Sequence, residues 1–365
     1  MHKHFETGKV LVAMSGGIDS SIAALLLKKA GYDLIGITMK TWDYESSKVN
    51  GKETGCCSLD SINDARIVAV KLGFPHYVLD IREEFTDKII HNFVEEYLSG
   101  RTPNPCVLCN THIKWDVLLK RADMLGCKYI ATGHYANIRF EKDRYILSKG
   151  KDHNKDQTYV LWGLKQDVLA RTLFPLAEYT KPQVREIAHQ HGFDYLIKKK
   201  ESYDICFIPD NDYRKFLKNR IPELPKKIGE GNFIYRGKIV GKHQGYPYYT
   251  IGQRKGLEVA LGHPVFVKEI IPEKNEIVLG DKEDLAQQIV RVRDYNIIKY
   301  QKLPDHFQAL VKIRYKDPGK MATIHTIDDT YLEFIFHEPV YAVAPGQSAV
   351  FYENEDLVGG GFICR

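Results

Sequence analysis

The stretch Val10–Ser21, VLVAMSGGIDSS, constrains the fold of this chain more than any other part of the sequence. Its first four residues are apolar, which is typical of a buried strand in a parallel sheet. The run ends at Ser15–Gly17, and Ile22–Ala30 then has helical composition. A strand, a glycine turn and a helix point backbone N–H groups and a positive dipole end at one anion. We therefore predict an anion site, where Asp19 either caps the helix or holds Mg²⁺.

The SGGIDS motif of residues 15–20 is not the GxxxxGK[ST] phosphate loop, because no Lys follows the glycines. It resembles the SGGxDS signature of the PP-loop ATP pyrophosphatases, which split ATP between the α- and β-phosphates. Members of that superfamily adenylate a carbonyl-type oxygen and release pyrophosphate. The resemblance implies an ATP-using enzyme.

The length and net charge of the chain limit the number of domains and the kinds of partner that we expect. A chain of 365 residues is too long for one ordinary core, so we expect two or three domains. A net charge of +5 is only mildly favourable for a polyanionic partner. The sequence shows no apolar run of the roughly 20 residues that span a membrane, and its start lacks the apolar region of a signal peptide. We expect a cytoplasmic protein.

The first half of the chain alternates between strand and helix patterns. Apolar β-type runs at 32–39, 76–81 and 129–132 are separated by helical patterns at 61–72, 85–98 and 113–125. This alternation predicts βαβ units and a parallel sheet. Ligands bind such sheets beyond the carboxyl ends of the strands. Met39 and Gly133 fall at such ends, as does the phosphate loop.

The composition and the pattern of apolar residues change near residue 211. Residues 229–267 and 290–365 are rich in Gly, Tyr and β-branched residues in short runs, including YYTIGQRKG at 248–256. Short strands with turn residues between them predict small β-rich domains, the last one a barrel. The expected domains are 1–210 (α/β, catalytic), 211–284 (small, central, β-rich) and 285–365 (C-terminal β-barrel).

Arg101–Trp115, RTPNPCVLCNTHIKW, is the second informative stretch. The prolines around Asn104 exclude regular structure and stiffen an extended loop. Cys106 and Cys109 follow at the start of the next helix, where the dipole lowers the pKa of a thiol and favours the reactive thiolate. A polar loop is a poor place for core cysteines, which favours catalytic or metal-binding thiols.

The chain has seven cysteines, an odd number that argues against a disulfide framework in a cytoplasmic protein. Cys206, in SYDICFIP, would alone be read as a core residue. Cys127 is expected in the core, and Cys56 and Cys57 are expected to be bystanders in a polar loop. The run Lys198–Lys200 is either a solvated surface or a group that screens RNA phosphate and favours a nearby thiolate.

SGGIDSS, NPCVLCN and DICFI, with GQRKGL downstream, are together similar to the tRNA-specific 2-thiouridylases of the MnmA type. The matches continue in chain order through GHYA (133–136), KDQ (155–157), IGQRKGL (251–257), RY (314–315), APGQ (344–347) and the C-terminal GGGFI. The resemblance therefore covers essentially the whole chain.

The resemblance implies ATP-dependent 2-thiolation of the wobble uridine of tRNA, with lysine, glutamate and glutamine acceptors. Mg²⁺ would shield the pyrophosphate leaving group. The implied ATP-binding residues are Ala13, Met14, Ser15, Gly16, Gly17, Ile18, Asp19, Ser20, Met39 and Gly133. The uridine would be flipped out of its stack, and its O2 would attack the α-phosphate of ATP.

The resemblance also implies a sulfur route. Cys206 would carry a persulfide received from a cysteine desulfurase or a sulfur-relay protein. Cys109 would be the nucleophile that releases the sulfur onto the base, leaving a Cys109–Cys206 disulfide. The implied tRNA contacts are Asn104, Pro105, Cys106, His134, Lys155, Asp156, Gln157, Arg314, Tyr315 and Gln347.

One position departs from the family pattern. Many members carry Asp, a candidate general acid or base, where this chain has Cys106. In this chain the general acid or base is another residue, or the Cys106 thiol takes that role. A third alternative is that Cys106, Cys109 and Cys206 together ligate an iron–sulfur cluster with one open iron. A further alternative is a PP-loop ligase that acts on a small molecule. A non-catalytic RNA-binding protein is the alternative from another class, and the intact SGGIDS motif argues against it.

Overall fold

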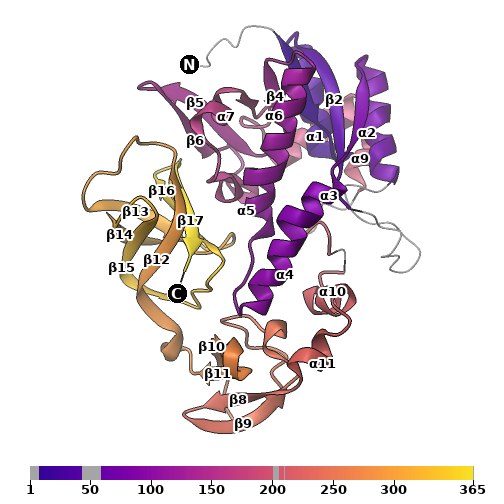
Figure 1. The fold of residues 1–365 in the computed structure, drawn as a ribbon. Helices are drawn as coiled ribbons and strands as arrows, with labels where there is room; N and C mark the ends of the chain where they lie inside the picture. The colour runs from indigo at the N-terminus through magenta and orange to yellow at the C-terminus, as the bar shows by residue number, and fades with distance from the viewer. Residues whose placement is uncertain (1–7, 43–58, 200–204, 209, 365) are drawn as a thin grey trace.

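The structure is a computed structural model that describes residues 8–42, 59–199, 205–208 and 210–364. Figure 1 shows an α/β region built from the first half of the chain, a small sheet formed by β8–β11, and a β-barrel that contains the C-terminal strands. The predicted fold class is confirmed: a parallel sheet is followed by a β-rich central part and a closed barrel.

Five parallel strands form the first sheet, in the order β3–β2–β1–β4–β7. They are β1 (Lys9–Ala13), β2 (Asp33–Lys40), β3 (His76–Asp80), β4 (Tyr129–Ala131) and β7 (Thr172–Leu173). The central strand β1 is buried on both faces, because Val12 packs in one hydrophobic cluster and Leu11 in another. Alternate residues of a strand point to opposite faces, so this short apolar run supports helices on both sides.

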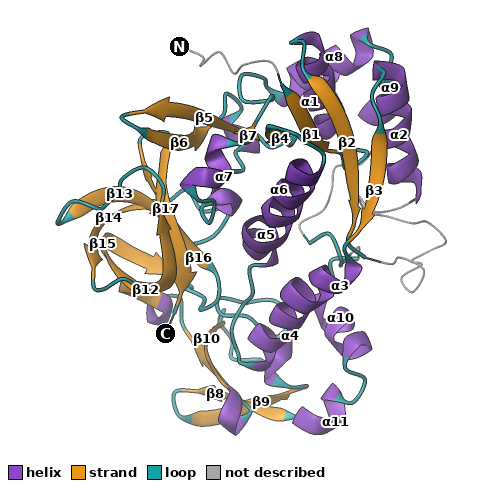
Figure 2. Cartoon of the chain, turned by 45° about the horizontal axis from the view of Figure 1, so that its top comes forward, coloured by secondary structure: helices purple, strands orange, loops and turns teal. Residues whose placement is uncertain are grey.

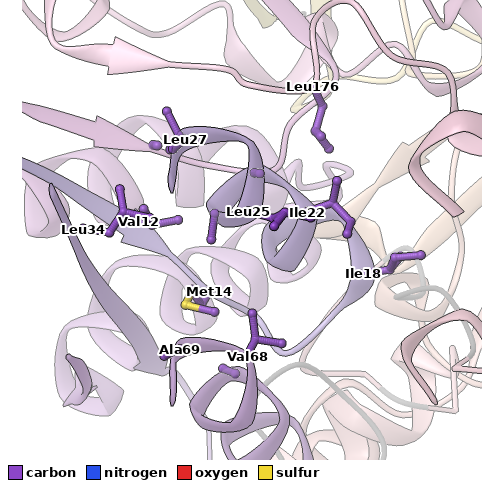
Figure 3. Packing of buried hydrophobic residues seen from close by; sticks show 14 of the residues in the cluster. Val12, Met14, Ile18, Ile22, Leu25, Leu27, Leu34, Val68, Ala69 and Leu176 are labelled. Carbon is purple, nitrogen blue, oxygen red and sulfur yellow. The ribbon is translucent and has the colours of Figure 1, made fainter. Parts of the chain in front are cut away.

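Helices cover both faces of this sheet. The Val12 face is covered by α1 (Ile18–Lys29), α2 (Leu59–Leu72), α8 (Lys181–Gln190) and α9 (Asp194–Ile197). Figure 3 shows Ile22 and Leu25 of α1 packed with Val12 and Val68 in this cluster. The opposite face is covered by α6 (Trp115–Met124) and α7 (Gln166–Ala170).

Two helices are longer than their sequence patterns predict, and each contains a π-helical segment. The first runs through α3 (Arg82–Phe85), η2 (Thr86–Ile90) and α4 (His91–Leu98). The second runs through α5 (Pro105–Cys109), η3 (Asn110–Lys114) and α6, so the helix start predicted at Cys106 and Cys109 is confirmed, and it is continuous with the helical pattern that begins at Ile113. Proline is favoured in the first turn of a helix, which explains the start at Pro105. π-Helical segments are frequent at functional sites.

The central part contains a sheet in the order β10–β11–β8–β9. Its strands are β8 (Gly231–Tyr235), β9 (Lys238–His243), β10 (Phe266–Ile271) and β11 (Glu276–Gly280), and two helices precede them, α10 (Tyr213–Arg220) and α11 (Leu224–Ile228). The strand expected within residues 248–256 is wrong: these residues form turns, with positive φ at Gly252 and Gly256. Glycine tolerates that backbone conformation, whereas a regular strand excludes it.

Six antiparallel strands close into the C-terminal barrel, in the order β12–β15–β14–β13–β16–β17, and pairing of Val292 with Ile363 closes it. They are β12 (Ala286–Ile297), β13 (Phe307–Lys312), β14 (Lys320–Thr326), β15 (Tyr331–Tyr341), β16 (Ser348–Glu353) and β17 (Asp356–Ile363). Alternating buried residues such as Leu332, Phe334 and Phe336 fill the interior.

A hairpin from the first half of the chain extends the barrel sheet. Strands β5 (Ala136–Glu141) and β6 (Arg144–Lys149) pair with each other, and β6 then pairs with β17 through Ser148 and Asp356. In Figure 2 this hairpin lies between the parallel sheet and the barrel. The two folding units are therefore joined by main-chain hydrogen bonds as well as by side chains.

A buried ion-pair network reinforces this joint. Arg139 of β5 donates to both carboxylate oxygens of Asp356, at 2.6 and 2.8 Å. Lys299 Nζ donates to the same carboxylate at 2.6 Å. Burial raises the pKa of Asp356, but the hydrogen bonds from Arg139 and Lys299 outweigh it, so that the pKa lies below its ordinary value.

Among the described residues, no helix combines the length and the apolar character that crossing a bilayer requires. Cys127 is 3% exposed in the core beneath the sheet, as predicted. Cys56 and Cys57 lie outside the described residues, as does Lys200. Lys199, which precedes it, is paired with Asp64 of α2.

Candidate active site

The predicted phosphate loop connects β1 to α1, and α1 begins at Ile18 directly after Gly17. The hydroxyl of Ser20 accepts a hydrogen bond from the backbone N–H of Ser15 at 3.1 Å and donates to the carbonyl of Gly17 at 3.2 Å. Gly16 has φ +70°, and a Cβ there would lie 2.0 Å from the carbonyl oxygen of Ser61 in α2. Gly16, the first glycine of the motif, thus allows the loop to pass close to the backbone of α2 just before α1 begins.

Asp19, in the first turn of α1, is held by groups from two other parts of the chain. Lys181 Nζ donates to both of its carboxylate oxygens at 2.7 Å, and the hydroxyl of Tyr135 donates to Oδ1 at 2.8 Å. Lys181 is 5% exposed, whereas the side chain of Asp19 is 34% exposed. The Asp19 carboxylate is therefore partly neutralised and still accessible beside the loop.

Gly133 packs directly behind this helix end. A Cβ on Gly133 would lie 2.7 Å from the backbone nitrogen of Ser20 and 2.8 Å from the carbonyl carbon of Asp19. These are backbone atoms that cannot rotate away, so only glycine permits the approach. The close contact explains why a Gly at the end of β4 belongs to the same site as the loop.

His134, the next residue, is half-buried between aromatic rings. Its ring lies 5.5 Å from Trp115 and 6.0 Å from Phe174. Its Nδ1 is 2.7 Å from the hydroxyl of Thr132. Burial, and then the ammonium group of Lys114, hold the pKa of His134 well below its ordinary value, so the imidazole is neutral at pH 7.

Cys106 and Cys109 lie in the first turns of the continuous helix that begins at Pro105, and both are half-buried. The extended segment before it, residues 101–104, has no regular structure, as its prolines predict. Asn110 fixes the helix from the other side, because its Nδ2 donates to the carbonyl of Val160 at 3.1 Å.

Cys206 also lies half-buried, beside Phe207. The Phe207 ring contacts Phe93 at 5.2 Å and Phe216 at 5.3 Å, which anchors this segment in the aromatic core under α4 and α10. Met39, Cys109 and Cys206 all pack against this one hydrophobic cluster. These three side chains, from the end of β2, from α5 and from the Cys206 segment, therefore border the same extended apolar core.

The cluster alternative requires three thiolates around one metal group. Among the described residues, no group of three His, Cys, Asp or Glu side chains is arranged to hold a metal ion. Cys106, Cys109 and Cys206 are all described, so in this structure they do not form such a set. The residues present therefore do not fit an iron–sulfur cluster, and no step is derived through one.

The KDQ loop, expected to contact tRNA, makes internal hydrogen bonds. Asp156 Oδ1 accepts from the backbone N–H and the hydroxyl of Thr158, at 3.0 and 2.7 Å. Gln157 Oε1 accepts from the backbone N–H of Tyr135 at 3.0 Å. The Asp156 carbonyl accepts from the hydroxyl of Tyr315 at 2.9 Å, which brings the barrel to this loop.

Other expected tRNA contacts differ in exposure. Arg314 and Tyr315 are exposed on the barrel, and Lys155 is half-buried. Asn104 and Pro105 are buried. Gln347 donates from Nε2 to the carbonyl of Pro103 at 2.8 Å, so it lies against the segment that leads to the cysteines.

Sequence reasoning missed Lys181 and Tyr135 as members of this site. Lys181 is the first residue of α8, directly after the N-cap residue Thr180. A lysine at a helix N-terminus is electrostatically unfavourable, and this anomaly could have indicated an acidic partner. Tyr135 lies within the GHYA motif, but no pattern in the sequence shows that its hydroxyl reaches Asp19.

Three family models match successive parts of the chain. Residues 8–210 match the tRNA methyl transferase HUP domain, residues 214–281 the tRNA methyl transferase PRC-barrel domain, and residues 287–363 the aminomethyltransferase beta-barrel domain. A solved 4-thiouridine synthetase–RNA complex with bound ATP is 18% identical, with a TM-score of 0.37, over 60% of this chain and 52% of the other. That likeness is too low to support an argument.

Curated relatives are much more similar. A tRNA-specific 2-thiouridylase MnmA of Amoebophilus asiaticus is 60% identical over 358 residues, covering 98% of this chain and 95% of the relative. Another of Salinibacter ruber is 56% identical over 360 residues, covering 98% and 94%. This full-length similarity shows that the chain belongs to the tRNA-specific 2-thiouridylase MnmA family.

Proposed function

We propose that this protein is an ATP-dependent tRNA sulfurtransferase that converts the wobble uridine of lysine, glutamate and glutamine tRNAs to 2-thiouridine. Its membership of the MnmA family supports the reaction class. The observation that supports the chemistry most directly is the common cluster on which Met39, Cys109 and Cys206 pack. A predicted nucleotide contact and two thiols that are distant in the sequence thus border one apolar core, which supports the proposal.

The phosphates of ATP are proposed to bind at the N-terminus of α1, where backbone N–H groups and the helix dipole favour negative charge. Gly133, one of the ten residues predicted to bind the nucleotide, packs against the backbone of Asp19 and Ser20 at this end. Mg²⁺ needs only one or two carboxylates in addition to phosphate oxygens, so Asp19 suits it. Bound there, Mg²⁺ would stabilise the charge of the departing pyrophosphate.

In the first step, the uridine O2 attacks the α-phosphorus of ATP. An O–P bond forms, the bond to the β-phosphate bridging oxygen breaks, and the base loses its N3 proton. Lys181 keeps the Asp19 carboxylate from repelling the incoming phosphates. The product is an O2-adenylated base whose leaving group is AMP.

In the second step, the terminal sulfur of a Cys206 persulfide attacks C2 of the base and AMP leaves. The Cys109 thiolate then attacks the Cys206 sulfur, the S–S bond to the transferred atom breaks, and 2-thiouridine is released. Two thiols are oxidised to a Cys109–Cys206 disulfide, which an external dithiol must reduce. A cysteine desulfurase or a sulfur-relay protein would restore the persulfide.

The tRNA is proposed to lie across the barrel and the first domain, with Lys155, His134, Arg314 and Tyr315 as contacts. Arg314 and Tyr315 are exposed and suit phosphate and base stacking. Asp156 and Gln157 would act by shaping the loop that carries Lys155, given their internal hydrogen bonds. Cys106 would border the base.

The experiment is thiolation of unmodified tRNA by anaerobically purified protein, with ATP, Mg²⁺, a cysteine desulfurase and labelled cysteine. Cys106→Ala, Cys109→Ala and Cys206→Ala are compared with wild type, and Cys364→Ala, at a half-exposed thiol near the C-terminus, is the matched control. Iron and acid-labile sulfide are measured in every preparation.

Activity of iron-free protein that is lost in the Cys109 and Cys206 variants and retained in the Cys364 variant supports the persulfide route. Activity that follows iron content and disappears in the Cys106, Cys109 and Cys206 variants alike would contradict that route and support the cluster alternative. ATP cleavage that needs no tRNA, without thiolation, would favour a ligase for a small molecule.

A further inference from the structure

The segment that leads to Cys106 and Cys109 is held by a loop of the C-terminal barrel, residues 344–348. The carbonyl of Pro345 accepts a hydrogen bond from the backbone N–H of Thr102 at 2.8 Å. Gln347 Nε2 donates to the carbonyl of Pro103 at 2.8 Å and to that of Thr102 at 3.4 Å. A carboxamide nitrogen has two N–H donors, and here both have a carbonyl partner.

Ser348 adds a second, buried attachment. Its hydroxyl, with the residue 0% exposed, accepts from Asn104 Nδ2 at 3.4 Å and from Trp162 Nε1 at 3.1 Å. Its carbonyl accepts from the hydroxyl of Tyr159 at 2.8 Å. One barrel residue thus connects the residue before Pro105 to the wall of the first domain.

The loop itself is rigidly attached to the barrel. Ile363 of β17 donates to the Gln347 carbonyl at 2.7 Å and accepts from the Gly346 N–H at 2.9 Å. Gly346 has φ +91°, and a Cβ there would lie 2.7 Å from the Thr102 carbonyl oxygen, so the two segments are in close contact. Displacement of this loop would therefore displace the start of α5.

We propose that Gln347 is a positioning residue, which sets the orientation of the helix that carries Cys106 and Cys109 before any RNA binds. The expected effect of Gln347 on the rate of tRNA thiolation rests on the proposed function. Its expected effect on the accessibility of the Cys109 thiol does not, because that effect concerns the protein alone. A direct contact of Gln347 with tRNA, which the family resemblance implies, is the competing role. In the structure both N–H groups are directed at backbone carbonyls, so only Oε1 remains for such a contact.

The test compares Gln347→Met, which keeps the length of the side chain and removes both donors, and Gln347→Glu, which places a carboxylate against two carbonyls. Gln308→Glu, at an exposed position of β13 in the same barrel, is the matched control. The rate of iodoacetamide alkylation at Cys109 is measured by peptide mass mapping in the full chain, without tRNA or ATP. The pH runs from about 6 to about 10, around the ordinary pKa of a thiol. Cys206 serves as the reference within each sample.

We expect alkylation of Cys109 in both Gln347 variants to be about two- to tenfold faster, because the hydrogen bonds from Nε2 to the carbonyls of Thr102 and Pro103 no longer restrain the segment before the half-buried thiol. The rate of Cys206 alkylation in the Gln347 variants should equal that in wild type. The Gln308 variant should have the melting temperature of wild type. In tRNA thiolation, kcat should fall while KM for tRNA is retained.

An unchanged alkylation profile of Cys109 overturns the proposal, and a raised KM for tRNA would then assign Gln347 to RNA contact. If neither Gln347 variant folds, Ser348→Ala gives the same readout, since it removes the acceptor of Asn104; an unchanged Cys109 profile there also overturns it. Altered alkylation in a protein that never thiolates tRNA would retain the positioning role and contradict the proposed function instead.

Discussion

Lys181 Nζ lies 2.7 Å from each carboxylate oxygen of Asp19, although 162 residues separate the two in the chain. The ammonium group is buried and the carboxylate is partly exposed at the N-terminus of α1. The ammonium group therefore offsets the negative charge of the carboxylate at the helix end where we propose that the phosphates of ATP bind.

Lys181→Met should abolish this compensation. We expect kcat/KM for ATP to fall by about 100-fold or more, which is typical when a preorganised charged group is removed from an active site. The free energy of unfolding should fall by about 1.5–3 kcal/mol, the contribution of a hydrogen bond to a charged group. Lys151→Met, at an exposed lysine of the same domain, is the control; steady-state kinetics give kcat/KM for ATP, and calorimetry gives the affinity for ATP. Unchanged ATP affinity would show that Asp19 needs no counter-charge.

Gly133→Ala should disturb the phosphate loop through backbone contact. The added Cβ would lie 2.7 Å from the Ser20 nitrogen, so β4 and α1 must separate. We expect overpacking to destabilise the fold by about 1–3 kcal/mol and ATP binding to weaken. Gly241→Ala, where the nearest contact is an ordinary 3.4 Å from Val259, is the comparison by thermal unfolding and ATP titration. Equal effects in both variants would contradict the close approach.

Arg139→Ala should loosen the joint between the hairpin and the barrel. Asp356 would retain Lys299 but lose its bidentate partner, and we expect a loss of about 1–3 kcal/mol in the free energy of unfolding. Arg291→Ala, which removes an exposed pair with Glu333, should cost about 1 kcal/mol or less. Urea unfolding measures the loss in the free energy of unfolding for both variants. A loss in Arg139→Ala no larger than that in Arg291→Ala would contradict a stabilising role of the joint.

The pH dependence of this joint has a defined sign. Because the pKa of Asp356 in the folded protein lies below its unfolded value, its contribution is present above the unfolded pKa of about 3.9. It is lost as the pH falls through the folded pKa. The difference in stability between wild type and Asp356→Asn should therefore shrink on acidification below about pH 4.

His243 predicts acid sensitivity in a higher pH range. Burial lowers the pKa of His243 to about 4. It packs between Phe233 and Tyr249, and its Nδ1 accepts from the Gly245 N–H at 3.1 Å. The unfolded state binds the extra proton first, so stability is full above about pH 6.5 and falls by up to about 3 kcal/mol toward pH 4. His243→Asn, which retains an acceptor, should flatten the melting temperature in this range. A slope equal to that of wild type would assign the sensitivity to other groups.

Local patterns predicted the parts of the fold that local physics determines. The apolar run 10–13 and the glycines after it indicated a strand and a helix N-terminus, and both are present. Turn residues indicated the β-rich second half, although Gly252 and Gly256 made turns where a strand was expected. α10 and α11 had no prediction at all.

Long-range pairing could not be predicted in the same way. Nothing near Asp19 indicates Lys181, and nothing near Gln347 indicates that its carboxamide meets Thr102 and Pro103. These contacts depend on how the sheet, the hairpin and the barrel are placed, and no periodicity within a single element encodes that placement. The prediction that Cys109 and Cys206 act together came only from the motifs around them, which occur together in one family.

The shared sheet also has a consequence for synthesis of the protein on the ribosome. Ser148 of β6 pairs with Asp356 of β17, and 356 − 148 = 208 residues must be added before that partner exists. At about 5–20 residues per second, the nascent chain carries an unpaired strand edge for roughly 10–40 seconds. Such edges invite pairing with other chains. A chain truncated before the last strands would therefore expose an unpaired strand edge and would be prone to aggregate.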